Sequence, residues 1–137
     1  MLAFDRVAME VIKQHSNDEV PNEACGILAG KQLGNEKAVT DVVKCSNVDV
    51  SPKNAYTIDS AELLKTIIEL ESSQSIEHIG FYHSHPFSSP NPSMVDLNRA
   101  TWDGFIYAIY SVPENRFLCF QWLEEKKVLK PLKFSIR

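Results

Sequence analysis

The chain lacks the features that mark secreted, membrane-spanning and disulfide-stabilised proteins. Its 137 residues include only three cysteines, Cys25, Cys45 and Cys119, an odd number at wide spacings that favours neither a disulfide framework nor a Cys-x-x-Cys metal site. No apolar run approaches the roughly 18 residues of a membrane span, and the first residues lack the basic and apolar regions of a signal peptide. We therefore expect no membrane association and a cytoplasmic, reducing location.

Clustered positive charge is also missing from most of the chain. Lysine and arginine number 14 against 18 acidic residues, a formal net charge of -4, whereas binding along nucleic-acid phosphates requires grouped cations. We expect no nucleic-acid partner. The exception is the segment 126–137, which has no acid and carries Lys126, Lys127, Lys130, Lys133 and Arg137. A solvated strand face explains this segment, and docking of an acidic partner is the alternative.

What remains is typical of one globular domain with helices and strands. The composition is 44% hydrophobic and 23% charged, without repeats or low-complexity tracts, and a chain of this length can bury one core, so we predict a single domain over residues 1–137. A helix is predicted over about residues 4–15, with an apolar face formed by Phe4, Val7, Ala8, Val11 and Ile12.

A second helix is predicted after Asp59, which together with Glu62 resembles a capping box, and should end near residues 72–75; a third, short helix begins at Ser93. The predicted strands cover residues 24–30, 38–44, 56–58, 77–84, 105–111, 116–122 and 128–136. This order predicts an α/β fold in which helices pack against a mixed sheet.

The clearest chemical signal is His83-Ser84-His85-Pro86 at the end of a predicted strand. Period-two alternation from residue 77 to residue 85 places Ile79, Phe81, His83 and His85 on one face. The two imidazoles can then reach one ion at about 2.0–2.1 Å each. An edge strand with two solvent-facing histidines is the alternative. His15 and His78 have no partner pattern, and we expect both at the surface.

A catalytic zinc usually has three protein ligands and an open position for water, so a third ligand is needed. Asp96 follows His85 by eleven residues, after the proline- and serine-rich loop 86–92 that can return the chain to the strand end. Ser93 and Asp96 also form a Ser-x-x-Asp pattern, which alone is equally well explained as a helix capping box.

Hydrolysis also needs a group that moves a proton from water to the leaving nitrogen. Glu23 is the best candidate, because it stands at the entrance of the apolar strand 24–30, where partial burial raises the pKa of a carboxyl group. A glutamate at a strand entrance is more often exposed. Cys25 is expected as a buried apolar residue, not as a ligand.

Together these residues resemble the signature of the JAMM/MPN zinc metalloprotease family: an upstream glutamate, His-x-His-Pro, and Ser-x-x-Asp at a fixed distance. The segment 21–30 is similar to stand-alone bacterial and archaeal members. The resemblance implies a curved mixed sheet packed between helices in three layers, a zinc ion held by His83, His85 and Asp96, Glu23 as general acid/base, and Ser93 as the stabiliser of the oxyanion.

The resemblance further implies hydrolysis of an amide or isopeptide bond after the C-terminal glycine of a ubiquitin-like or sulfur-carrier protein. The chain extends only 41 residues beyond Asp96, which leaves little room for the long insertions of eukaryotic deubiquitinases. The alternatives are a non-catalytic interaction module of the MPN type, a non-haem iron enzyme with a facial triad, and a purely structural zinc site. The physiological substrate and the oligomeric state are not specified by the sequence.

Overall fold

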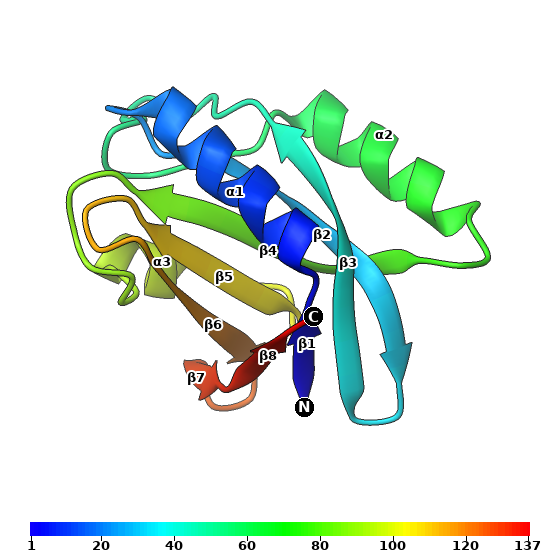
Figure 1. Cartoon of the computed structure of the whole chain (residues 1–137). Coiled ribbons are helices and arrows are strands. Elements are labelled where there is room, and N and C mark those ends of the chain that lie inside the picture. The colour runs from blue at the N-terminus through cyan, green and yellow to red at the C-terminus, as the bar shows by residue number, and fades with distance from the viewer.

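The computed structural model describes residues 1–137, which form eight strands and three helices (Figure 1). The strands are β1 (Leu2–Phe4), β2 (Cys25–Leu33), β3 (Glu36–Cys45), β4 (Glu77–His85), β5 (Ile106–Ser111), β6 (Arg116–Leu123), β7 (Val128–Leu132) and β8 (Phe134–Ile136). The helices are α1 (Arg6–Glu19), α2 (Ser60–Glu71) and α3 (Met94–Arg99). No helix is long and apolar enough to cross a membrane.

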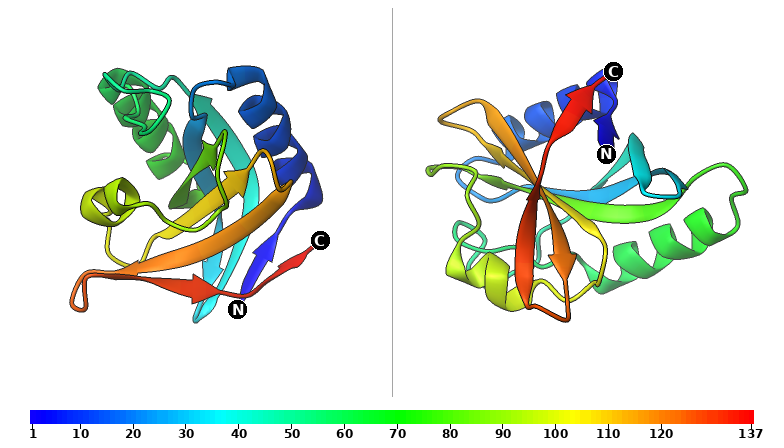
Figure 2. Two further views of the ribbon diagram at one scale, coloured as in Figure 1. Left: turned by 90° about the vertical axis from the view of Figure 1, so that its left-hand side faces the viewer. Right: turned by 90° about the horizontal axis from the view of Figure 1, so that it is seen from below.

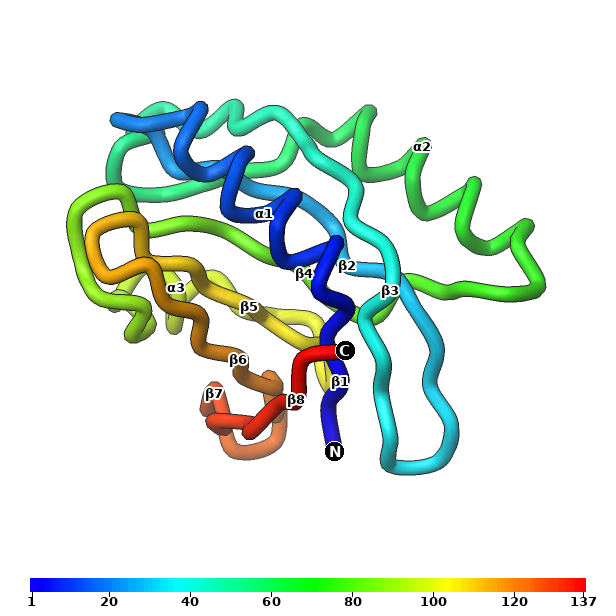
Figure 3. Tube along the Cα trace, in the orientation of Figure 1, coloured from blue at the N-terminus to red at the C-terminus, as the bar shows by residue number.

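All eight strands belong to one strongly curved, mixed sheet with the order β7-β6-β5-β4-β2-β3-β1-β8. The pairs β1–β3, β1–β8 and β4–β5 are parallel, and the other pairs are antiparallel. The two end strands, β7 and β8, are separated in sequence by Lys133 alone, and the tube in Figure 3 passes directly from one into the other. The chain therefore nearly closes the sheet on itself.

Hydrophobic residues cover both faces of the sheet. One cluster of 14 buried residues includes Phe4, Ile12 and Tyr82 and is covered by α1, while a second cluster of 10 includes Ile27, Phe81 and Trp122 on the opposite face. Figure 2 shows α1 on one side of the sheet and α2 and α3 on the other. The predicted α/β fold, a curved mixed sheet packed between helices, is confirmed.

The N-terminal prediction was wrong in its details. Residues 2–4 form a strand because β3 and β8 pair with it on either side, and the helix begins only after Asp5, whose carboxylate accepts a hydrogen bond from the Ala8 amide at 3.0 Å. Val7 is 69% exposed, so the helix buries a different face, formed by Ala8, Met9, Ile12 and Ser16.

Two strand predictions also need correction. The expected strand 128–136 is divided between β7 and β8 at Lys133, because its two halves pair with opposite edges of the sheet. The expected strand 56–58 is reduced to one isolated bridge between Asn47 and Ile58.

A bulge in the pairing of β2 with β4 changes the side-chain alternation. Leu28 pairs with Gly80 but the next residue, Ala29, pairs with His78. Ile79 therefore joins the cluster under α1, whereas Phe81 packs in the other cluster. The predicted placement of Ile79 on the same face as Phe81 was wrong. His78 is half-buried, with its ring against Phe81, Trp102 and Phe105, so its expected surface position was also wrong.

Candidate metal centre and active site

Three side chains converge where β4 ends beside α3. His83 and His85 lie beyond the bulge, so they share one face as predicted, and α3 places Asp96 against them. The Nε2 atom of His83 lies 3.0 Å from Oδ1 of Asp96, the Nε2 atom of His85 lies 3.1 Å from Oδ2, and the two Nε2 atoms are 3.3 Å apart. All three residues are at least nine-tenths buried.

The spacing of these donor atoms suits a metal ion. Donors bound tetrahedrally at about 2.0–2.1 Å lie roughly 3.3 Å from one another, close to the observed separations. Without a cation, two imidazoles and a carboxylate would pack their polar atoms together in a site with little access to water. The group His83, His85 and Asp96 therefore fits a divalent ion and supplies three donors, one fewer than a tetrahedral site holds.

The surroundings orient the two imidazoles. Nδ1 of His85 lies 2.7 Å from the Ser89 carbonyl oxygen, a contact that directs Nε2 toward the cluster. The ring of Tyr56 stacks on His83, with centroids 4.6 Å apart and an interplanar angle of 23°. Nδ1 of His83 is buried and has no hydrogen-bond partner.

Electrostatic interactions within the cluster stabilise its charged forms. Burial alone would raise the pKa of Asp96, but the neighbouring histidines and the Ser93 amide outweigh it and hold that pKa well below the ordinary range. Burial would likewise lower the pKa of His85, yet its contacts with Asp96 and the Ser89 carbonyl raise it. A carboxylate that stays ionised in a buried position is a suitable ligand for a cation.

Ser93 and Asp96 form the capping box that the sequence pattern allowed as an alternative. The Ser93 hydroxyl accepts a hydrogen bond from the Asp96 amide at 3.1 Å, and Oδ2 of Asp96 accepts one from the Ser93 amide at 2.8 Å. The same Oδ2 atom lies beside His85, so Asp96 caps the helix and faces the histidines at once. The hydroxyl of Ser93 acts as an acceptor in the cap, which leaves its proton free for donation.

Glu23 precedes β2 and is only 4% exposed. Burial raises the pKa of its carboxyl group to about 7, while His83 and His85 oppose this shift, which places the carboxyl within electrostatic reach of the cluster. Its Oε1 atom is buried without a hydrogen-bond partner. A carboxyl with a pKa near neutrality and a free oxygen can both accept and donate a proton at physiological pH.

Contacts between distant segments hold Glu23 in place. The Glu23 amide donates to the Pro52 carbonyl at 2.7 Å, and the Asn47 side-chain amide donates to the Glu23 carbonyl at 3.0 Å. The next amide, that of Ala24, donates to the Ser84 hydroxyl at 2.8 Å, between the two histidines of β4. Loop 46–54 and the end of β4 thus fix the glutamate from two sides.

Sequence reasoning missed several residues of this site. Asn47, Tyr56 and Arg99 act through partners that are distant in the sequence, and no local pattern marks them. Arg99 of α3 donates to the Asp49 carboxylate at 2.5 Å and to the Tyr56 carbonyl at 3.2 Å, which joins α3 to loop 46–57. Only the asparagine- and aspartate-rich composition of the loop indicated a network of turn hydrogen bonds.

Cys25 does not belong to the cluster of candidate ligands. The residue is fully buried, its Sγ atom lies 3.9 Å from the Cys45 carbonyl oxygen, and burial raises the pKa of the thiol far above its usual range. Cys25 packs in the same apolar cluster as Ile27 and Phe81, as expected from the sequence.

Residues 5–123 match the model of the prokaryotic homologues of the JAB domain. The chain is 38% identical over 119 residues to the desampylase of Haloferax volcanii, covering 84% of this chain and 83% of that protein. It is 32% identical over 97 residues to the CysO-cysteine peptidase of Mycobacterium tuberculosis, covering 71% of this chain and 64% of the relative.

Its fold resembles that of a solved structure of a JAMM metalloprotease-like zinc site in the proteasome and signalosome. The TM-score is 0.61 at 16% identity, and the match covers 100% of this chain and 98% of the other. At this identity the likeness concerns the fold, while the matched family model and the two relatives concern the sequence. The chain therefore belongs to the family of prokaryotic JAB-domain proteins and is a JAMM-type hydrolase.

Proposed function

We propose that the chain is a zinc-dependent metallopeptidase or isopeptidase that hydrolyses the amide bond after the C-terminal glycine of a ubiquitin-like or sulfur-carrier protein. The observation that carries this proposal is the buried group of His83, His85 and Asp96 beside a glutamate whose pKa is raised to about 7. Such a group combines the two requirements of metal-assisted hydrolysis, a cation site and a proton carrier.

His83, His85 and Asp96 would hold the zinc ion. Two imidazoles and one carboxylate are a known ligand set of catalytic zinc, which keeps a fourth position for water or substrate. A zinc ion in such a site lowers the pKa of a water molecule to about 7 and polarises a substrate carbonyl. A structural zinc is disfavoured, because those sites usually have four protein ligands, and no cysteine is among the three residues.

Glu23 and Ser93 would supply the remaining chemistry. Glu23 would take a proton from water and deliver it to the leaving nitrogen, which requires a carboxyl that exchanges protons near neutral pH. Ser93 would donate its free hydroxyl proton to the oxygen that becomes negative when the carbonyl is attacked. Both residues lie outside the set that would hold the cation.

The relatives support the substrate class. The desampylase and the CysO-cysteine peptidase bear names that refer to conjugates of small carrier proteins, and the chain covers most of the desampylase. A C-terminal tail ending in glycine has no bulky side chain, so it can approach a buried site as an extended strand. Three free cysteines fit the reducing cytoplasm in which we propose that the enzyme acts.

A first prediction concerns the metal content of the protein. The purified protein should contain about one equivalent of zinc per chain, and the double substitution His83→Ala and His85→Ala should remove it. Elemental analysis separates zinc from iron, the metal expected for a facial-triad enzyme. Stoichiometric zinc retained by the double variant would remove these histidines from the site.

The Glu23→Gln substitution separates metal binding from catalysis. The variant should keep its zinc but lose hydrolysis of a ubiquitin-like conjugate by at least about 100-fold, because the amide cannot carry the proton. The matched control is Glu125→Gln, an exposed glutamate in the turn between β6 and β7. Turnover by Glu23→Gln at the wild-type rate would exclude Glu23 from the mechanism.

A further inference from the structure

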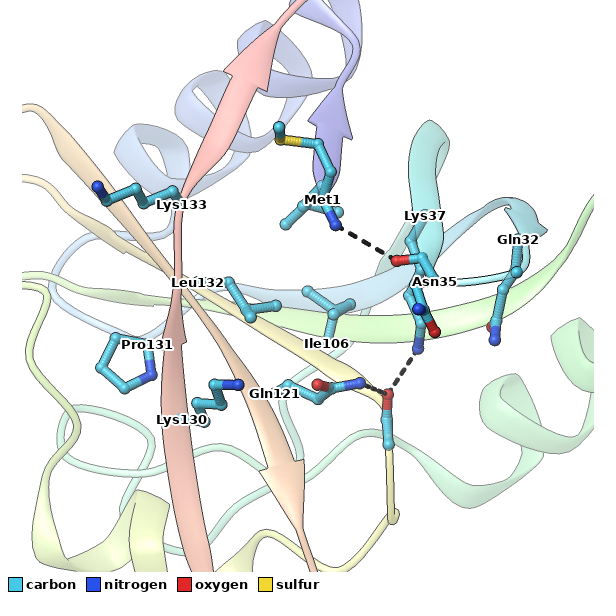
Figure 4. Close-up of a pocket in the computed structure, with 13 residues that line it drawn as sticks. Met1, Gln32, Asn35, Lys37, Ile106, Gln121, Lys130, Pro131, Leu132 and Lys133 are labelled. Atoms are coloured by element: carbon cyan, nitrogen blue, oxygen red, sulfur yellow. Dashed lines mark hydrogen bonds between the residues drawn. The ribbon is translucent and has the colours of Figure 1, made fainter.

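A cavity of about 580 Å³ opens at the end of the sheet where β1, the β2–β3 turn, β5, β6 and β7 meet. Figure 4 shows its lining, with Ile106 and Leu132 at the centre. The cavity is separate from the metal centre, because Ile106 pairs with Gly80 whereas His83 pairs with Ile109, roughly 10 Å further along the strands. Ile106 also belongs to the core under α1, on the other face of the sheet.

Positive charge is concentrated around this cavity. Lys37, Lys130 and Lys133 line it, none of them has a carboxylate within 4.0 Å, and no aspartate or glutamate is among the lining residues. Glu77 acts on Lys37 only from a greater distance. In a chain with a net charge of -4, these three unpaired lysines attract anions to this cavity.

Hydrogen bonds fix the inner wall of the cavity. The Lys37 ammonium group donates to the Gly104 carbonyl at 2.6 Å, and the Gln121 side-chain amide donates to the same oxygen at 3.1 Å (Figure 4). Lys37 is half-buried and keeps two further N–H donors, whereas Lys130 and Lys133 are exposed. An inner cation fixed by a hydrogen bond, with solvent-exposed outer cations, suits a ligand that enters from solvent.

The lining also restricts the class of ligand. No aromatic ring is present to stack on a nucleobase, and no arginine is present to bind a planar anion in a bidentate manner. The uncharged polar side chains of the lining are the amides of Gln32, Asn35 and Gln121. The volume lies in the range of small-molecule sites.

We propose that this cavity is a second binding site, distinct from the metal centre, for a small non-aromatic polyanion that carries phosphate or carboxylate groups. The anionic groups contact the lysines, and the uncharged part of the ligand lies on the accessible apolar side chains of Pro131 and Leu132, because Ile106 below them is buried. The proposal is independent of the reaction at the metal centre. It also gives a role to the basic C-terminal segment, whose Lys130 and Lys133 line the cavity.

The test uses the full chain as purified, labelled with ¹⁵N. Inorganic phosphate, propane-1,2,3-tricarboxylate and the acidic peptide oligoglutamate are titrated separately at constant ionic strength, with sodium chloride as the reference. Saturable amide shifts are expected at Gly34, Gly104 and Gln121. Tighter saturation by phosphate indicates a phosphorylated ligand, and tighter saturation by the tricarboxylate indicates a carboxylate ligand.

Paired lysine variants test the assignment. The double variant Lys130→Gln and Lys133→Gln should bind the better probe at least about fivefold more weakly. The double variant Lys65→Gln and Lys126→Gln removes the same charge outside the cavity and should bind as wild type. The proposal fails if neither anion gives saturable shifts at the cavity, if both double variants weaken binding equally, or if only an acidic peptide such as oligoglutamate produces the shifts.

Discussion

At the scale of single residues, Glu23 differs from a surface glutamate because its carboxyl is buried and one oxygen has no partner. Burial raises its pKa from 4.5 to about 7, so between these values the folded chain holds a proton that the unfolded chain releases. The stability of the metal-free protein should therefore fall as pH rises through this window. The cost of burying the charged form is the physical basis of the proton-transfer role proposed for Glu23.

A prediction follows for the metal-free, chelated protein. Glu23→Gln stays neutral at every pH, so at about pH 8 its free energy of unfolding should exceed that of wild type by about 1–3 kcal/mol. The difference should disappear below about pH 4.5, where Glu23 is protonated in both states. Urea unfolding across this pH range measures it, and parallel pH profiles for the two proteins would contradict the assignment.

Ser93 combines a structural and a proposed chemical role, and these can be separated. Ser93→Gly should cost only a few tenths of a kcal/mol of stability, because glycine is tolerated at an N-cap. Without the hydroxyl donor, kcat should fall about 100- to 1000-fold while the zinc content stays the same. Ser93→Thr keeps a hydroxyl and should retain most of the activity; equal activity of the glycine and threonine variants would leave Ser93 with the capping role alone.

At the scale of elements, Arg99 links α3 to the loop 46–57. Arg99 donates to oxygens of Asp49, Tyr56 and Thr57, so it joins the helix that carries Asp96 to the loop whose Tyr56 ring stacks on His83. The hydrogen bond from Arg99, together with those from the Ser51 amide and the Thr57 hydroxyl, lowers the pKa of Asp49 to about 2. The loop and the helix therefore support the candidate ligands as one unit.

Arg99→Gln should loosen this unit. We expect zinc affinity to fall about tenfold, in the range found when groups that orient metal ligands are removed, and hydrogen exchange to increase in residues 47–57. Arg116→Gln is the matched control, because its ion pair with Glu114 is exposed and it makes no hydrogen bond to α3 or to loop 46–57. If both variants bind zinc as wild type does, α3 is held by its capping box and apolar contacts instead.

Local patterns were sufficient where an element depends on its own sequence, and insufficient where it depends on a partner strand. Short segments were enough to predict the capping residues Asp59 and Ser93. They were also enough to predict that His83 and His85 share one face of β4. The bulge that moves Ile79 to the other face arises from pairing with β2. The hydrogen bond from the Asn47 side chain to the Glu23 carbonyl joins residues 24 positions apart, and no local sequence pattern predicts it.

At the scale of the whole molecule, the near closure of the sheet links the two ends of the chain. β8 pairs with β1, and the Phe134 ring meets the Phe4 ring edge-on at a centroid distance of 6.2 Å. Phe4 is fully buried and also contacts Phe117, so this aromatic group connects β1 and β8 at one edge of the sheet with β6, the strand next to the other edge. Phe117 lies at the register of Ser84, between the two candidate histidines, but its ring packs in the cluster under α1, on the face of the sheet opposite the metal centre.

Stability and metal binding should therefore respond separately to a change where β8 pairs with β1. Phe134 is half-buried, so Phe134→Ala should lower the free energy of unfolding by about 1–2 kcal/mol, less than the loss of a fully buried phenylalanine. Zinc content and turnover should stay at wild-type levels below the unfolding transition, and the exposed neighbour Ser135→Ala should change none of these quantities. A loss of zinc from Phe134→Ala while the chain remains folded would show instead that closure of the sheet controls the geometry of β4, because β8 has no other connection to the ligands than the sheet itself.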